Sequence, residues 1–313
     1  MKIACPNCQQ HYSLAAHDLG RNLECICGYK FSISEEHKTN STENQEREKE
    51  QEKKGHISDY FIIKPLGVGG AGQVFLADHP TLNIPVALKI LSKSVDDNLN
   101  EARRFVRESQ LAAQLNHPNI LRIFDSGLHD DRPYYVMEYT DKGNLAQKIE
   151  RQGKLSEKDT RHVAVSLARA LRETHKHKIV HRDIKPENIM IGRDGGYKLA
   201  DLGLAKTMTE SSQSKNLTGI NATMGTPHFM PPEQALNAEE ADIRADIYSL
   251  GVSLYQCLTG KLPFMGKTTG EILKKQLNQA PPPIDAFNPE ASQQIIQIIA
   301  KCLAKNPDHR FQS

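Results

Sequence analysis

The stretch that decides the fold of this chain is His181-Arg182-Asp183-Ile184-Lys185-Pro186-Glu187-Asn188. A carboxylate at Asp183, an ammonium group at Lys185 and an amide at Asn188 fall within six residues. The apolar run 189–191 follows directly and is typical of a short buried strand. The plain alternative is a polar turn between two strands, in which these side chains carry no chemistry.

These residue types suit the transfer of a phosphoryl group. An attacking hydroxyl needs a carboxylate to orient it and accept its proton, and an amide oxygen can hold Mg²⁺ without adding charge. Asp183 would do the first and Asn188 the second. A strand predicted at 197–200 then delivers a further carboxylate, Asp201, which lies 18 residues beyond Asp183.

Length and composition are those of an ordinary globular chain. It has 313 residues, of which 38% are hydrophobic and 25% charged, and its formal net charge of +2 implies no strongly charged partner. No apolar run approaches the roughly 18–20 residues that span a bilayer, and the N-terminus has no apolar core like that of a secretory signal. We therefore expect a cytoplasmic chain without a membrane segment, whose six cysteines are reduced or metal-bound.

Two close pairs of cysteines open the chain, Cys5 with Cys8 and Cys25 with Cys27. Four thiolates suit a tetrahedral Zn²⁺ ion, which would supply folding energy to a module of about 30 residues. The segment 1–33 resembles a zinc ribbon, although its second pair is C-x-C rather than C-x-x-C. Reduced thiols or redox pairing are the alternatives, and two histidines are possible substitute ligands, His11 and His17.

The segment 34–58 is charge-rich and has almost no apolar residues, so it is predicted to be a flexible linker. The module before it, 1–33, contains only three Lys and Arg residues, too few for a nucleic-acid-binding patch. We expect this module to contact a protein partner rather than nucleic acid.

The composition becomes globular at residue 59, where a strand over 60–66 leads into a glycine-rich loop. The loop reads Gly67-Val68-Gly69-Gly70-Ala71-Gly72-Gln73-Val74. Such a loop alone is a weak signal, because it also opens dinucleotide-binding folds. Here it leads into a strand rather than a helix, and the following strand carries Val86-Ala87-Leu88-Lys89. Glycines let the backbone approach nucleotide phosphates.

Taken in order, the motifs of residues 59–313 resemble those of a bacterial eukaryotic-like Ser/Thr protein kinase. The resemblance implies an α+β, two-lobed protein kinase fold, with a small β-rich N-lobe over 59–140 and a helical C-lobe over 141–313, preceded by the zinc-ribbon-like module. A final helix would normally follow Ser313. We therefore expect a fragment of a longer protein, whose missing part could include a membrane anchor.

The resemblance implies a role for each motif residue. The expected catalytic residues are Asp183, Lys185, Asn188, Lys89 and Glu108. Lys89 would pair with Glu108, with Glu101 as the alternative, and Asn188 and Asp201 would hold Mg²⁺. The residues expected to contact ATP are Leu66, Gly67, Val68, Gly69, Gly70, Ala71, Gly72, Gln73, Val74, Ala87, Lys89, Met137, Glu138, Tyr139 and Asp201.

Supporting contacts are implied as well. Asp246 would brace the backbone of the catalytic stretch, and Arg310 would pair with Glu233. An internal apolar stack would contain Ala112, Ile123, His181 and Leu202. Residues 157–176 have the spacing of an amphipathic helix, whose apolar positions are expected in the core: Val163, Val165, Leu167, Ala168, Ala170 and Leu171.

The 33 residues from Asp201 to Glu233 resemble an activation segment. The middle of this segment is rich in Ser and Thr, and Thr218 and Thr223 are the expected sites of a phosphorylation switch. The alternative is a mobile surface loop without a regulatory role.

The function implied is ATP-dependent, non-specific phosphorylation of Ser and Thr residues of protein substrates, regulated by autophosphorylation. A pseudokinase scaffold, which binds ATP or proteins without transferring phosphate, is the alternative. Pseudokinases usually lack an equivalent of Lys89, Asp183 or Asp201, and this chain has all three.

Overall fold

The structure is a computed structural model that describes residues 2–4, 11–13, 20–25, 28–32, 55–69, 72–91, 109, 112–202, 227–237 and 241–313. The chain divides into two compact units, 1–62 and 63–313. Several predicted site residues lie outside the described residues: Cys5, Cys8, Cys27, Gly70, Ala71, Glu101, Glu108, Thr218 and Thr223.

The N-terminal unit contains two pairs of short antiparallel strands. β1 (Lys2–Ala4) pairs with β2 (His11–Ser13), and β3 (Asn22–Glu24) pairs with β4 (Lys30–Ser32). Beyond β3, the N–H of Gly28 donates to the carbonyl of Cys25 at 2.8 Å. Cys25 and Phe31 are both buried, so the cysteine that follows β3 lies in the interior of the unit.

A six-stranded sheet forms the β-rich part of the fold, with strand order β5-β6-β7-β8-β10-β9. The strands are β5 (His56–Ile57), β6 (Tyr60–Gly69), β7 (Gly72–Asp78), β8 (Pro85–Leu91), β9 (Ile123–His129) and β10 (Arg132–Glu138). β8 is central and buried from Val86 to Leu91, as its run of apolar residues predicts. Gly72 adopts φ +147°, and a Cβ there would lie 2.1 Å from the carbonyl oxygen of Ile90, so only glycine lets β7 begin this close to β8.

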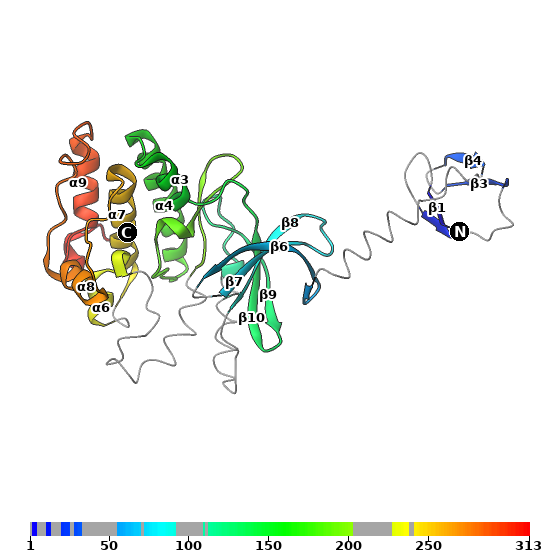
Figure 1. The fold of residues 1–313 in the computed structure, drawn as a ribbon, viewed down its shortest axis with the longest axis horizontal. Coiled ribbons are helices and arrows are strands. Elements are labelled where there is room, and N and C mark those ends of the chain that lie inside the picture. Colours follow the sequence, from blue (N-terminus) through cyan, green and yellow to red (C-terminus); the bar gives the residue numbers. More distant parts are fainter. Residues whose placement is uncertain are drawn as a thin grey trace. The chain divides into compact units, whose positions relative to one another are not determined.

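Helices follow the sheet, and Figure 1 shows them grouped together beside it, as the predicted two-lobed α+β fold requires. They are α3 (Leu145–Gln152), α4 (Glu157–Lys176), α6 (Pro232–Leu236), α7 (Ile243–Thr259), α8 (Thr269–Asn278) and α9 (Gln293–Cys302). Polar side chains cap their N-termini, for example Asn144 in a capping box with Gln147, and Ser156 before α4. A short hairpin, β11 (Ile189–Ile191) with β12 (Tyr197–Leu199), lies between α4 and α6 in the sequence.

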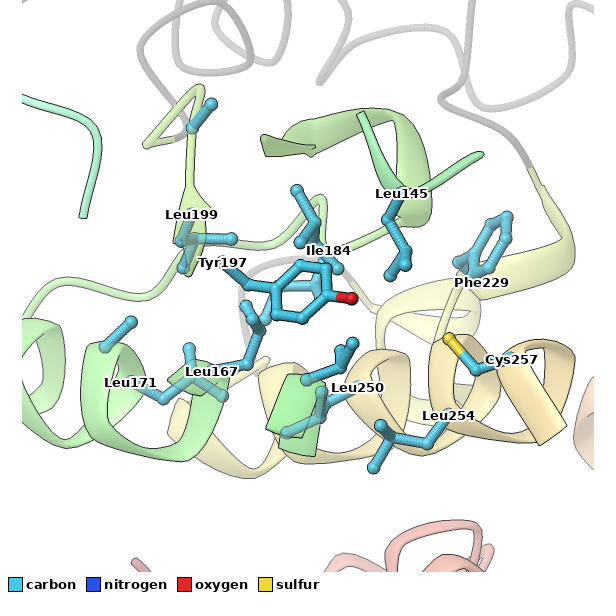
Figure 2. Close-up of a cluster of buried hydrophobic side chains, with 14 of the residues drawn as sticks. Leu145, Leu167, Leu171, Ile184, Tyr197, Leu199, Phe229, Leu250, Leu254 and Cys257 are labelled. Carbon is cyan, nitrogen blue, oxygen red and sulfur yellow. The ribbon is translucent and has the colours of Figure 1, made fainter. Parts of the chain in front are cut away.

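The core beneath this hairpin is built mainly from α4 and α7. Figure 2 shows Tyr197 and Leu199 with Ile184 facing side chains of both helices, among them Leu167 and Leu250. Because the hairpin rests on buried apolar residues, its polar ends are held in fixed positions.

The helix predicted at 157–176 has those bounds in the structure, but two of its six predicted core positions are wrong. Val165 is 49% exposed, and Ala168 is also exposed. Val163, Leu167 and Leu171 repeat at four-residue intervals and share the buried face, whereas Val165 points about 200° away from Val163 around the helix.

Candidate functional site

Two residues 112 positions apart in the sequence, Lys89 and Asp201, form the centre of the site. Lys89 extends from β8, and Asp201 follows the end of β12. The Lys89 Nζ lies 2.5 Å from Asp201 Oδ2, and the lysine side chain is only 9% exposed. Burial alone would raise the pKa of Asp201, but the charge and hydrogen bond of Lys89, together with the hydroxyl of Tyr135, outweigh burial and lower that pKa. The carboxylate is therefore ionised at neutral pH.

The β11–β12 hairpin brings Asn188 beside this pair. Ile189 lies opposite Leu199 in the register, and the N–H of Ala200 donates to the carbonyl of Asn188 at 2.9 Å. Asp201 is the next residue and takes the left-handed conformation, φ +59°. The sequence motif at 181–188 and the carboxylate 18 residues beyond Asp183 thus meet at one end of the hairpin.

The stretch 181–188 is closed by a short 3₁₀ turn, Pro186–Asn188. This turn lets the Asn188 Nδ2 donate to the backbone oxygen of Asp183 at 2.8 Å and to its Oδ2 at 3.0 Å. Lys185 Nζ lies 3.1 Å from the same Oδ2. The amide nitrogen of Asn188 is turned toward Asp183, so the amide oxygen is turned away from it and is a suitable oxygen donor for Mg²⁺.

Asp246 braces the backbone of the stretch, as predicted. This fully buried carboxylate accepts the N–H of His181 at 2.9 Å and the N–H of Arg182 at 2.8 Å. His175 Nε2 lies 3.3 Å from Asp246 Oδ2. The brace holds Arg182 at φ +61°, a left-handed conformation that a non-glycine residue seldom adopts without such support.

His181 links the stretch to the residue before Asp201. Its ring is fully buried, and Nδ1 accepts the N–H of Asp183 at 3.2 Å. The proton therefore resides on Nε2, which donates to the carbonyl of Ala200 at 2.8 Å. Ala112, Ile123 and Leu202 are buried in one apolar cluster, and His181 is buried as well, so each member of the predicted stack is inside the protein.

The residues expected around an adenine ring lie on the sheet and the segment after it. Ala87 and Met137 are cross-strand partners and both are buried, while Val74 and Tyr139 pack against the same cluster. The N–H of Glu138 donates to the carbonyl of Arg122 at 2.9 Å. A base edge at Glu138 would therefore be met by its carbonyl rather than its N–H.

The C-terminal part of β6 is open along its outer edge. Leu66 is 41% and Val68 is 76% exposed, and a Cβ added at Gly67 or Gly69 would meet no atom within 4 Å. These glycines leave room for a ligand to approach the backbone of β6.

The direct Lys89–Asp201 pair was not predicted, since Lys89 was expected to pair with Glu108, and two further contacts of the site were not predicted either. The carboxylate of Glu138 pairs with Lys198 Nζ at 2.7 and 2.8 Å, which ties the end of β10 to β12. Tyr135 donates its hydroxyl to Asp201 Oδ1. The alternation of side chains along 132–138 would have placed Tyr135 on one face of a strand, but only the pairing of β10 with β8 identifies Lys89 as its neighbour.

The Glu233–Arg310 pair is present as predicted. Arg310 Nη1 and Nη2 lie 2.6 and 2.8 Å from the two carboxylate oxygens of Glu233.

Among the described residues no helix is long and apolar enough to cross a bilayer. No cluster of three or more metal-binding side chains appears in that same part of the chain, from which Cys5, Cys8 and Cys27 are missing.

Residues 60–313 match the family described as "Protein kinase domain". The serine/threonine-protein kinase PrkC of Bacillus subtilis is 38% identical over 254 residues, which are 81% of this chain and 38% of the relative. The serine/threonine-protein kinase PknB of Mycolicibacterium smegmatis is 35% identical over 263 residues, covering 82% of this chain and 42% of the relative. The chain thus spans about two fifths of the length of these relatives.

A solved structure shares the fold. The crystal structure of the PknI kinase domain of Mycobacterium tuberculosis, solved for a cysteine-to-alanine mutant, superposes with a TM-score of 0.65 and 28% sequence identity. The match covers 83% of this chain and 93% of that domain, so it includes both the sheet and the helices.

Proposed function

We propose, since this chain belongs to the protein kinase family, that it transfers the γ-phosphate of ATP to Ser and Thr hydroxyls of protein substrates. The observation that carries the proposal is the convergence of Lys89, Asp201, Asn188 and Asp183 on one end of the β11–β12 hairpin. Lys185, two residues beyond Asp183, favours Ser and Thr over Tyr as the acceptor. No observation favours the pseudokinase scaffold.

Each side chain has a definite task in this reaction. Asp183 orients the acceptor hydroxyl and accepts its proton, while Lys185 neutralises charge on the transferred group; its Nζ lies 3.1 Å from Asp183 Oδ2, which supports this role. Lys89 would bind the α- and β-phosphates. Positioning and charge neutralisation supply most of the acceleration in reactions of this kind.

The oxygen atoms of Asp201 and Asn188 fit the ligand preference of Mg²⁺, which takes carboxylate and amide oxygens. An ionised Asp201 is the form that a cation needs, and Lys89 and Tyr135 lower the pKa of this carboxyl against the effect of burial. When bound, Mg²⁺ would neutralise phosphate charge. Met137, Glu138 and Tyr139 would line the adenine site.

The test is mass spectrometry of the purified chain after incubation with Mg-ATP and a generic protein substrate. We expect phosphate on Ser and Thr for the parent, and loss of transfer with retained ATP binding for Asp183→Asn. Glu187→Gln is the matched control, because it removes an exposed carboxylate of the same stretch. Transfer by Asp183→Asn at the parental rate would refute the mechanism, and ATP binding without any transfer by the parent would identify a scaffold.

The same spectra test the proposed regulation. Thr218 and Thr223 are the proposed autophosphorylation sites, on the strength of the Ser- and Thr-rich sequence between Asp201 and Glu233. Replacement of both by Ala should lower activity toward the substrate without affecting ATP binding. Phosphate confined to other residues would contradict this assignment.

The proposed organisation is a zinc-ribbon-like module over 1–33, a linker over 34–58 and the kinase domain over 59–313. The burial of Cys25, whose carbonyl accepts the N–H of Gly28, supports a ligand role for it with Cys5, Cys8 and Cys27. Elemental analysis of the full chain should find one zinc per molecule, which Cys8→Ser removes and Cys302→Ala, a change in α9, retains. Equal zinc in both variants would reject the site.

A further inference from the structure

Tyr135 lies in the middle of β10, and its side chain reaches the same carboxylate as that of Lys89. It is 1% exposed and lies directly opposite Lys89 in the register of β10 and β8. Because register partners project to the same face of a sheet, the two side chains run side by side. The Lys89 Nζ lies 5.7 Å from the centroid of the Tyr135 ring, a cation–π distance.

The two side chains hold Asp201 from two directions. Tyr135 donates its hydroxyl to Oδ1, and Lys89 donates to Oδ2 at 2.5 Å. Asp201 lies just beyond the end of β12 in a left-handed conformation, so its side chain is not aligned by the strand itself. The orientation of its carboxylate is therefore set by these two donors.

The two donors differ in how they can respond to a nucleotide. Lys89 has a long flexible stem, and in the proposed function it turns to the phosphates, which takes its hydrogen bond from Asp201. Tyr135 is anchored in the buried sheet and has no such freedom. When Lys89 moves, the hydroxyl of Tyr135 remains as the fixed donor that holds the Asp201 carboxylate in its orientation.

We propose that Tyr135 is a positioning residue for Asp201, and that its hydroxyl sets the affinity of the site for the Mg²⁺ that accompanies the nucleotide. This inference rests on the proposed function, since it deepens the role of Asp201 as a metal ligand. Hydrogen-bonding partners of a metal-binding carboxylate commonly contribute about 10–100-fold to metal affinity. A phenylalanine at 135 would fill nearly the same volume and remove only the hydroxyl.

The test measures binding of ADP to the full chain by calorimetry, first in EDTA and then across a series of Mg²⁺ concentrations. For Tyr135→Phe we expect the Mg²⁺ concentration that gives half-maximal enhancement of ADP binding to rise about tenfold or more. ADP affinity in EDTA should equal that of the parent. A purely structural role would not separate these two quantities.

Tyr134→Phe is the matched control. Tyr134 is also buried on β10, but it projects to the opposite face of the sheet, where its hydroxyl lies near Gly127. The control should leave the Mg²⁺ midpoint unchanged. An unchanged midpoint for Tyr135→Phe, or an equal loss of ADP affinity with and without Mg²⁺, would overturn the inference. So would a lowered Tm with a parental midpoint, which would assign Tyr135 to stability alone.

These outcomes are separate from those of the proposed function. A Tyr135 effect on Mg²⁺-dependent ADP binding in a chain that transfers no phosphate would support the inference and reject the kinase activity. Phosphoryl transfer by the parent together with an unchanged Mg²⁺ midpoint for Tyr135→Phe would support the kinase activity and reject the inference about Tyr135.

Discussion

Breaking the ion pair between Glu233 and Arg310 should destabilise the helical part of the chain far more than breaking an exposed pair. The Arg310 side chain is 0% exposed and that of Glu233 is 16% exposed. The guanidinium makes two bonds to the carboxylate, at 2.6 and 2.8 Å. It also donates to three backbone carbonyls, those of Arg244, Ala304 and Lys305.

The magnitude follows from what each substitution leaves behind. Glu233→Gln leaves a buried guanidinium without its counter-charge, which costs about 3–5 kcal/mol of unfolding free energy. Arg310→Met removes the charge and leaves the carbonyls of Ala304 and Lys305 without this donor, at about 1 kcal/mol each, in addition to breaking the pair. We expect Arg310→Met to be at least as damaging as Glu233→Gln. The loss of unfolding free energy in the double variant should be about 2 kcal/mol smaller than the sum of the losses in the two single variants.

Urea unfolding followed by circular dichroism measures these free energies. Lys176→Met is the control, since the Lys176–Glu173 pair is exposed and should contribute less than about 1 kcal/mol. A cost below about 1 kcal/mol for Glu233→Gln, or a coupling energy near zero in the double variant, would refute the reasoning, because the pair would then behave as a solvated one.

Further predictions concern the backbone brace, a buried lysine and the glycine loop. Asp246→Asn should lower kcat about 10–100-fold at unchanged KM for ATP, because one of the two charge-assisted hydrogen bonds to the backbone of 181–188 is lost. An unchanged kcat would show that these hydrogen bonds do not support the reaction. Burial, with a contribution from the charge of Arg310, lowers the pKa of Lys305 to about 8. As the pH rises, the folded state then loses this proton before the unfolded state does. The Tm of the parent relative to that of Lys305→Met should therefore rise between about pH 8 and pH 10. A Tm difference that stays constant over this range would argue against the lowered pKa of Lys305. Gly72→Ala should lower the Tm by several degrees, since its Cβ would lie 2.1 Å from a carbonyl oxygen, while Gly69→Ala should leave the Tm unchanged; equal Tm values would contradict the close approach of β7 to β8.

Local spacing made much of the site predictable. The motif at 181–188, the strand lysine at 89 and the carboxylate at 201 each occur with a defined element beside them, so their order along the chain indicated the fold. Helix 157–176 was predictable for the same reason, because its apolar residues recur with the helical period. Val165 was misplaced because apolar character alone does not say which face of a helix meets a neighbour.

Other features depended on register and backbone direction. The N–H of Glu138 is occupied by the carbonyl of Arg122, a contact that depends on the strand pairing and not on the residue types. The role of Tyr135 likewise depends on its alignment with Lys89, since a shift of one residue would have turned the hydroxyl to the opposite face of the sheet.

Sequence by itself determined which chemical groups this protein has and the family to which it belongs, because those depend on residue identity and short-range spacing. Tertiary structure alone decided that Asp201 is held by Lys89 and Tyr135 together, with Asp246 supporting the stretch beside it. The physical reason is that hydrogen bonds require atoms within about 3 Å, a condition that only packing of the sheet and helices can meet for residues so far apart in the chain.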